Sequence, residues 1–160
     1  MDIHSLHNIL IILHAASATV SFFAGGILMF SRKYTSNQMV FLVYWWTLVG
    51  MTVLLAGSIL IYWTEYTGAE RIIFPGLLIL AIYMLYRARQ ASQLLQTQQN
   101  DWQQGYMEHI GFTLISLFEG FLIVSGLNAG LPGWLVAFLA ILGVLGGRWS
   151  IGFAQRRVEP

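Results

Sequence analysis

The sequence predicts an all-α membrane protein, a polytopic membrane helix bundle of about five transmembrane helices with almost no soluble part. Of its 160 residues, 57% are hydrophobic and only 9% are charged, and the mean hydropathy is +0.66. A soluble domain carries about 25% charged residues, so this chain is not built to face water. Its apolar residues also form several runs long enough to cross a bilayer, which takes roughly 20 residues of α-helix.

Five apolar stretches are predicted to span the bilayer as one transmembrane domain. The third and the fifth are short enough to be tilted or partly inserted. Between the third and the fourth lies a predicted cytoplasmic Gln-rich linker, residues 87–105, which begins as a helical extension and turns near Asn100 and Asp101. The predicted spans are residues 3–30, 39–63, 72–86, 106–127 and 132–147.

The basic residues predict the orientation in the cell membrane. Cytoplasmic loops retain positive charge during insertion, and in this chain Lys and Arg follow the first, third and fifth spans. We therefore expect a multi-pass protein with its N-terminus outside and its C-terminus in the cytoplasm. The residues concerned are Arg32, Lys33, Arg87, Arg89, Arg148, Arg156 and Arg157.

Charge and cysteine content exclude several functions. The net charge is only +1, and the basic residues lie at helix ends rather than in one patch, so no nucleic-acid partner is expected. With no cysteine, the chain cannot hold a disulfide, an iron–sulfur cluster or a thiolate nucleophile. It also has no Gly-rich nucleotide loop and no hydrolase motif, so a role other than an enzyme is favoured.

Polar residues inside the spans are the informative ones, because an ionisable side chain in hydrocarbon needs a partner or a water-filled cavity. At about 100° per residue, the first, second and fourth spans each carry a polar face, and such faces turn inward. The faces hold His4, His7, His14 and Ser21 on the first span, Tyr44, Met51 and Ser58 on the second, and Glu108, His109, Ser116 and Glu119 on the fourth.

His14 and Glu119 are predicted to meet, because they lie at similar depths on inward faces. We interpret them as the centre of a site that binds a small ligand or conducts protons, and the alternative is a purely structural hydrogen bond. Ser116, Tyr44 and Met51 lie on the same inward faces. His109 and Glu108 would extend the site toward the cytoplasm.

Haem b and metal ions are weaker alternatives. A haem would need His–Met ligation, for which His14 with Met51 and His109 with Met84 match in depth. A divalent metal could be held at the outer surface by His4 and His7 together with Asp2, although a solvated helix end explains the same residues.

The chain resembles a family of small bacterial membrane proteins of unknown function. The resemblance lies in Leu13-His14 through Gly25-Gly26 with Arg32 after them, in Tyr83-Met84-Leu85-Tyr86-Arg87-Ala88, in His109-Ile110-Gly111 and in Pro132-Gly133-Trp134. It implies a polytopic fold in the bacterial inner membrane and marks His14 as a notable position. The chain departs from the family at Ser36-Asn37-Gln38, where a His-Arg pair is expected, and no reaction is implied.

Three hypotheses for function follow. The first is a membrane protein with a polar site inside the bundle for a small ligand or for protons. The second is a redox protein that binds haem b or contacts quinone through the same histidines. The third is a non-catalytic accessory subunit of a larger membrane complex, and the predicted partners are the lipid bilayer and either further copies of the chain or such a complex.

Overall fold

The structure, a computed structural model, describes residues 3–31, 37–68, 70–98 and 102–132, without the side chains of 127 and 128, together with residues 135, 138, 139, 141–143, 145–147 and 149. Within these residues there are helices and no strands, which confirms the predicted all-α fold. The long helices are α1 (Ile3–Phe30), α2 (Gln38–Tyr62), α3 (Glu70–Thr97) and α4 (Trp102–Asn128). The described residues from 135 to 149 are helical as well.

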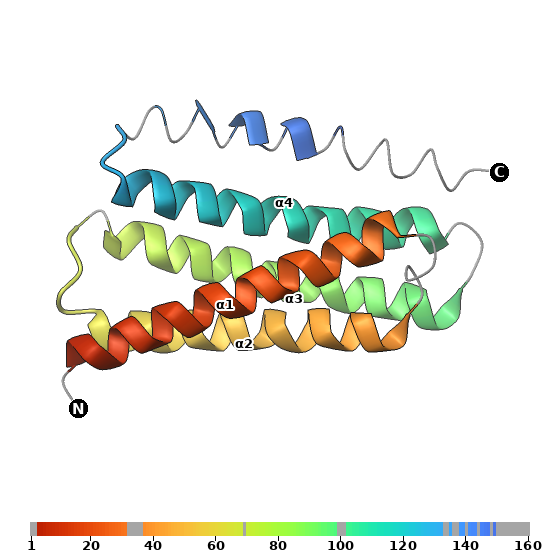
Figure 1. The fold of residues 1–160 in the computed structure, drawn as a ribbon, viewed down its shortest axis with the longest axis horizontal. Helices are drawn as coiled ribbons and strands as arrows, with labels where there is room; N and C mark the ends of the chain where they lie inside the picture. The colour runs from red at the N-terminus through yellow and green to blue at the C-terminus, as the bar shows by residue number, and fades with distance from the viewer. Residues whose placement is uncertain are drawn as a thin grey trace.

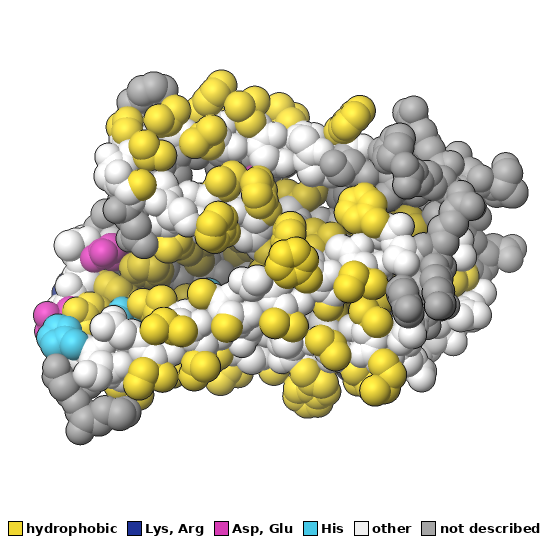
Figure 2. Space-filling model, in the orientation of Figure 1, with side chains coloured by type: hydrophobic (Ala, Val, Ile, Leu, Met, Phe, Trp, Pro, Cys, Tyr) yellow, Lys and Arg dark blue, Asp and Glu magenta, His cyan; other side chains and the backbone are white. Residues whose placement is uncertain are grey.

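All four long helices are long and apolar enough to cross a membrane. They contain 25 to 28 residues, and at about 1.5 Å per residue each exceeds the roughly 30 Å of bilayer hydrocarbon. Large hydrophobic side chains cover the outside of the bundle along its length (Figure 2). The protein is therefore an integral membrane protein, as its composition predicts.

The four helices run up and down in alternation (Figure 1). α1 begins at the end of the bundle where α2 finishes, α3 begins and α4 finishes, and we call this the N-terminal end. α2, α3 and α4 lie close to parallel with one another, whereas α1 crosses the bundle obliquely, packing mainly on α2 and less on α4. The helical residues after 134 lie along the outer side of α4.

One glycine allows the oblique α1 to approach two helices at once. A Cβ added at Gly25 would lie 3.0 Å from the side chain of Leu114 on α4 and 3.3 Å from that of Tyr44 on α2. Such separations are tighter than ordinary van der Waals contact, so α1 passes α4 closely at this point because glycine has no side chain. The crossing of α1 and α4 is thus fixed at Gly25 and Leu114.

α3 and α4 are longer than the spans predicted for them. α3 starts at Glu70 and continues to Thr97, and α4 starts at Trp102, so most of residues 87–105 is helix rather than linker. Ala88, Ala91 and Leu95 form a buried stripe on the second half of α3, and that stripe packs the extension against the bundle. Gln98 directly follows the helix, and its φ of 43° is the left-handed conformation common at helix C-termini. The turn predicted near Asn100 and Asp101 lies outside the described residues.

Candidate functional site

Three pairs of residues join α1 to α2 at intervals of seven residues, and we call this line of contacts the α1–α2 seam. Each step of seven forward along α1 matches a step of seven backward along α2. This repeat keeps one face of each antiparallel helix against the other. The pairs are His7 with Ser58, His14 with the carbonyl group of Met51, and Ser21 with the carbonyl group of Tyr44.

His7 lies in a cluster of aromatic and hydroxyl groups at the N-terminal end. Its Nδ1 is 3.1 Å from the Ser58 hydroxyl oxygen, and its ring stacks on that of Tyr62 with 3.9 Å between the centroids. The Tyr62 hydroxyl in turn is 3.1 Å from Nδ1 of His4. His7 is buried, with 8% of its surface exposed, so the cluster encloses an imidazole whose Nδ1 has a partner.

Tyr66 closes this cluster from the loop between α2 and α3. It is buried, contacts His7 and Tyr62 edge-on, and packs on Phe74 of α3 with 4.7 Å between the ring centroids. Desolvation by burial raises the pKa of the Tyr66 phenol, so it stays neutral near pH 7.

A capping box at the start of α3 holds the loop that carries Tyr66. The Glu70 carboxylate accepts hydrogen bonds of 2.8 Å from the backbone N–H and from the hydroxyl group of Thr67. The backbone N–H of Glu70 donates back to the Thr67 hydroxyl oxygen. This exchange fixes the first turn of the helix and the chain that enters it.

His14 occupies the middle of the seam. Its Nδ1 lies 2.9 Å from the carbonyl oxygen of Met51, and since a carbonyl oxygen only accepts, Nδ1 carries the hydrogen. In the neutral ring, Nε2 is therefore the basic nitrogen. His14 is half-buried.

The structure does not bring His14 and Glu119 together. His14 is bonded to Met51, and neither carboxyl oxygen of Glu119 has a hydrogen-bond partner among the described residues. From the crossing at Gly25 and Leu114, His14 lies eleven residues along α1, about 16 Å, whereas Glu119 lies only five residues along α4, about 8 Å. The predicted hydrogen bond between His14 and Glu119 is therefore not formed. The reason is that α1 runs obliquely, so that it contacts α4 near Gly25 but packs on α2 at His14.

Glu119 lies instead against the helical residues after 134. It is 7% exposed, and a Cβ added at Gly143 would collide with its Oε1 atom. Both carboxyl oxygens are fully enclosed. Ser116, one turn earlier on α4, is also buried.

His109 and Glu108 lie toward the end of the bundle opposite to the N-terminal end. Glu108 is exposed and receives a 3.3 Å hydrogen bond from the guanidinium group of Arg87 on α3. That guanidinium group also lies over the ring of Phe112, 5.1 Å from its centroid. His109 Nδ1 and Arg87 Nε are buried without a partner among the described residues. Both nitrogens could therefore still form a hydrogen bond.

Two tyrosines are fully buried inside the bundle, toward the end opposite to the N-terminal end. Tyr44 and Tyr106 are both 0% exposed and pack against Phe41, and their hydroxyl groups have no hydrogen-bond partner within the part of the chain that the structure describes. Tyr44 approaches Thr113, whose hydroxyl group donates to the His109 carbonyl oxygen at 3.2 Å. Sequence reasoning had selected Tyr44 but missed Tyr106, since an aromatic residue near a span end is read as interfacial.

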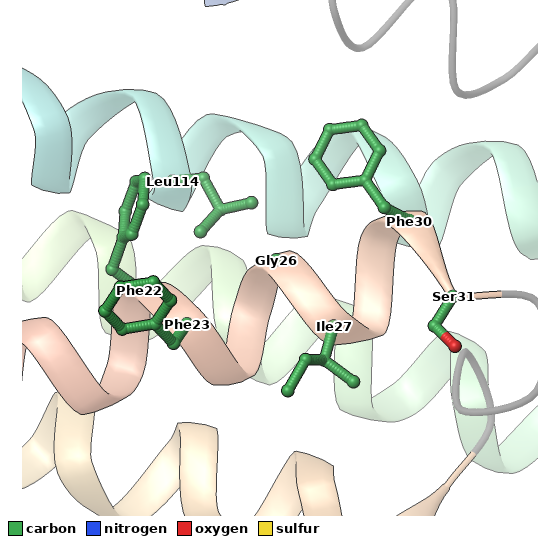
Figure 3. A pocket seen from close by; sticks show the side chains of 7 residues that line it. All are labelled: Phe22, Phe23, Gly26, Ile27, Phe30, Ser31 and Leu114. Atoms are coloured by element: carbon green, nitrogen blue, oxygen red, sulfur yellow. The ribbon is translucent and has the colours of Figure 1, made fainter.

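The described residues do not fit a haem. Two pockets among the described residues have volumes of about 450 and 320 Å³, and neither is lined by a histidine. The larger lies between α1 and α4 and is lined by apolar side chains such as Phe22 and Leu114 (Figure 3). Met51 and Met84 are buried in the packed core. Neither of these pockets is lined by a member of the axial pairs His14 with Met51 and His109 with Met84.

A metal site is not formed by the described residues either. Among them, no three His, Asp or Glu side chains are grouped so that they could hold an ion. His4 and His7 make hydrogen bonds to Tyr62 and Ser58 instead. Asp2, the third residue of the predicted surface metal site, lies outside the described residues.

The fold and the polar groups define the class of the protein as an integral membrane helical bundle with ionisable side chains on internal faces. No family model, curated protein or solved structure matches the chain. The resemblance to small bacterial membrane proteins, and the assembly into a homo-oligomer or a larger complex, therefore stay predictions.

Proposed function

We propose that this integral membrane protein transfers protons along the α1–α2 seam, with His14 as the central group that takes up and releases the proton. The observation that carries the proposal is the hydrogen bond from His14 Nδ1 to the Met51 carbonyl oxygen. It fixes the tautomer, so that Nε2 is the nitrogen that accepts a proton. An ionisable side chain held this way inside a membrane bundle is a candidate for function by default.

Other polar groups extend the path in both directions. Toward the N-terminal end, the His7 cluster reaches the exposed His4 through Tyr62. Toward the opposite end, the seam continues with Ser21, whose hydroxyl donates to the Tyr44 carbonyl oxygen at 3.3 Å. Successive seam positions are about 10 Å apart, so water molecules must bridge them.

Proton flux into lipid vesicles tests the proposal. The purified protein is reconstituted with a trapped pH-sensitive dye, and a potassium gradient with valinomycin sets the membrane potential. We expect flux well above that of protein-free vesicles, and His14→Gln should reduce it by at least about tenfold, because Gln can still donate to the Met51 carbonyl oxygen but cannot carry a proton.

The matched control is His109→Gln, since His109 lies on α4 and is not part of the α1–α2 seam. This variant should conduct like the unmodified protein. A flux equal to that of empty vesicles, or one that His14→Gln leaves unchanged, would refute the proposed path.

We propose in addition that the N-terminal end of the bundle faces the outside of the cell, on the basis of the basic residues after the predicted spans. The chain has no cysteine, so single cysteines report their own location. A membrane-impermeant maleimide should label Gly68→Cys in intact cells, and should label Gln96→Cys only after the membrane is opened. The reverse pattern would invert the topology.

A further inference from the structure

Glu119 and Ile115 contact the two glycines of a Gly-x-x-x-Gly sequence in the helical residues after 134. A Cβ added at Gly143 would collide with the Glu119 carboxyl group, and one added at Gly147 would collide with the Ile115 side chain. Gly143 and Gly147 are four residues apart, as are Ile115 and Glu119. The earlier glycine meets the later residue of α4, so the two segments are antiparallel. This is the close antiparallel packing that small residues four apart allow between membrane helices.

One member of this contact is a carboxyl group without a partner. Glu119 is 7% exposed, and both of its oxygens are enclosed and unbonded within the described part of the chain. A carboxylate anion in such a place would be shielded from water and would have no counter-charge among the described residues, whereas the neutral acid loses much less on leaving water.

No other charged side chain among the described residues compensates Glu119. On α3, Arg87 is paired with Glu108, eleven residues from Glu119 along α4, while Glu70 is bonded to Thr67 and Arg71 to the Thr64 carbonyl oxygen. The histidines of α1 are bonded to α2. The described residues between 135 and 149 carry no ionisable group.

We propose that Glu119 is a proton-binding site inside the membrane, in which the neutral carboxylic acid lies on the glycine surface of Gly143 and Gly147 and holds these residues against α4. Loss of the proton separates them from α4, because the carboxylate anion must reach water. The site is separate from the α1–α2 seam and does not rest on the proposed proton path.

Carbodiimide labelling tests the first half of the proposal. A lipid-soluble carbodiimide reacts with protonated carboxyl groups in hydrocarbon, and a water-soluble one reaches exposed carboxyl groups such as Glu108, whose side chain is 63% exposed. Peptide mass spectrometry of the full-length protein in vesicles should find Glu119 labelled by the lipid-soluble reagent, less at higher pH. The label should disappear in Glu119→Gln and persist in Glu108→Gln.

Two outcomes would overturn this half. One is no label on Glu119 from the lipid-soluble reagent, while Glu108 is labelled by the water-soluble one. The other is labelling of Glu119 by the water-soluble reagent as fast as Glu108, which would place it in water. Neither readout depends on proton flux, so the labelling and the flux experiment can fail independently.

Disulfide formation tests the second half. A Cβ at Gly147 would lie 3.4 Å from the Ile115 Cβ, close to the roughly 3.8 Å of a disulfide, so Ile115→Cys with Gly147→Cys should cross-link. The rate is compared between this double variant and the same variant carrying Glu119→Gln. The cross-linking rate of the variant with Glu119, divided by that of the variant with Glu119→Gln, should fall severalfold as the pH rises. Only the variant with Glu119 can lose the proton and separate Gly147 from α4. A ratio that stays constant with pH would overturn the coupling of the proton to the contact.

A glycine pair provides the packing control. A Cβ at Gly146 meets nothing within 4 Å, whereas one at Gly143 meets the Glu119 carboxyl group. Gly143→Ala should therefore change carbodiimide labelling of Glu119 severalfold, and Gly146→Ala should leave it unchanged. Equal effects of the two substitutions would contradict the placement of the carboxyl group on Gly143.

Discussion

The α1–α2 seam and the contact between α4 and Gly143 both enclose ionisable side chains, but they satisfy them differently. On the seam, each buried or half-buried histidine has a bonded nitrogen. At Gly143, the Glu119 carboxyl group has no partner among the described residues. α2 places a hydroxyl or carbonyl oxygen beside each of these histidines, whereas Gly143 has no side chain that could bond to the Glu119 carboxyl group. An inward polar face therefore does not by itself predict a bonded polar group.

The largest expected effect is at Gly25, where the seam meets α4. Gly25→Leu places atoms where Leu114 and Tyr44 already lie, so the free energy of unfolding should fall by about 1–3 kcal/mol or more, as for other overpacked cores. Equilibrium unfolding in mixed detergent micelles measures it. Gly26→Leu is the matched control, because a Cβ there meets nothing within 4 Å. Equal losses in both variants would show that the helices do not cross at Gly25.

Smaller effects are expected when a tyrosine loses its hydroxyl group, and their sign should depend on whether that hydroxyl group has a hydrogen-bond partner. Tyr106→Phe removes a buried hydroxyl group that has no partner among the described residues, and it should raise the free energy of unfolding by about 1 kcal/mol. Tyr62→Phe removes the hydroxyl group bonded to His4 and should lower it by about 0.5 kcal/mol. Unfolding of both variants under the same conditions decides the point. A loss for Tyr106→Phe would mean that its hydroxyl group is bonded, for example to water.

The smallest expected effect is the coupling between His7 and Ser58. A double-mutant cycle with His7→Phe and Ser58→Ala should give an interaction of about 0.6 kcal/mol, the average for hydrogen bonds between membrane helices. Phe keeps a ring to stack on Tyr62, so the cycle isolates the hydrogen bond. Additive losses would show that the hydroxyl–imidazole contact contributes nothing to stability.

Much of the fold could be predicted from hydropathy. The first helix has the predicted bounds, and the second differs by one residue at each end. The helical extension predicted at the start of residues 87–105 runs to Thr97, although its Arg and Gln residues lower the local hydropathy. Only the spacing of Ala88, Ala91 and Leu95 marks the face that packs on the bundle. An amphipathic helix end of this kind is recognised by its period rather than by its mean hydropathy.

For the site, the sequence could predict which residues share a face of one helix, but not which helix that face contacts. Helical periodicity correctly placed His7, His14 and Ser21 on one face of α1, but it could not choose which helix that face meets. The partner helix depends on the crossing angle of α1. Leu, Ile and Val side chains can pack well at several crossing angles, so the sequence does not fix this angle. The seven-residue spacing shared by α1 and α2 is the signal that could have identified the partner, and the four-residue spacing of Gly143 and Gly147 could have done so for Glu119.

The internal pairing of the seam bears on how the protein is made. Because His7, His14 and Ser21 of α1 find their partners on α2, α1 and α2 can enter lipid together as a helical pair, before the later helices are synthesised. We therefore expect nascent chains that end soon after α2 to be integrated in the membrane and resistant to alkaline extraction. Chains carrying α1 alone, with three unpaired histidines, should be extracted more readily, and equal extraction of the two would mean that the helices enter one by one.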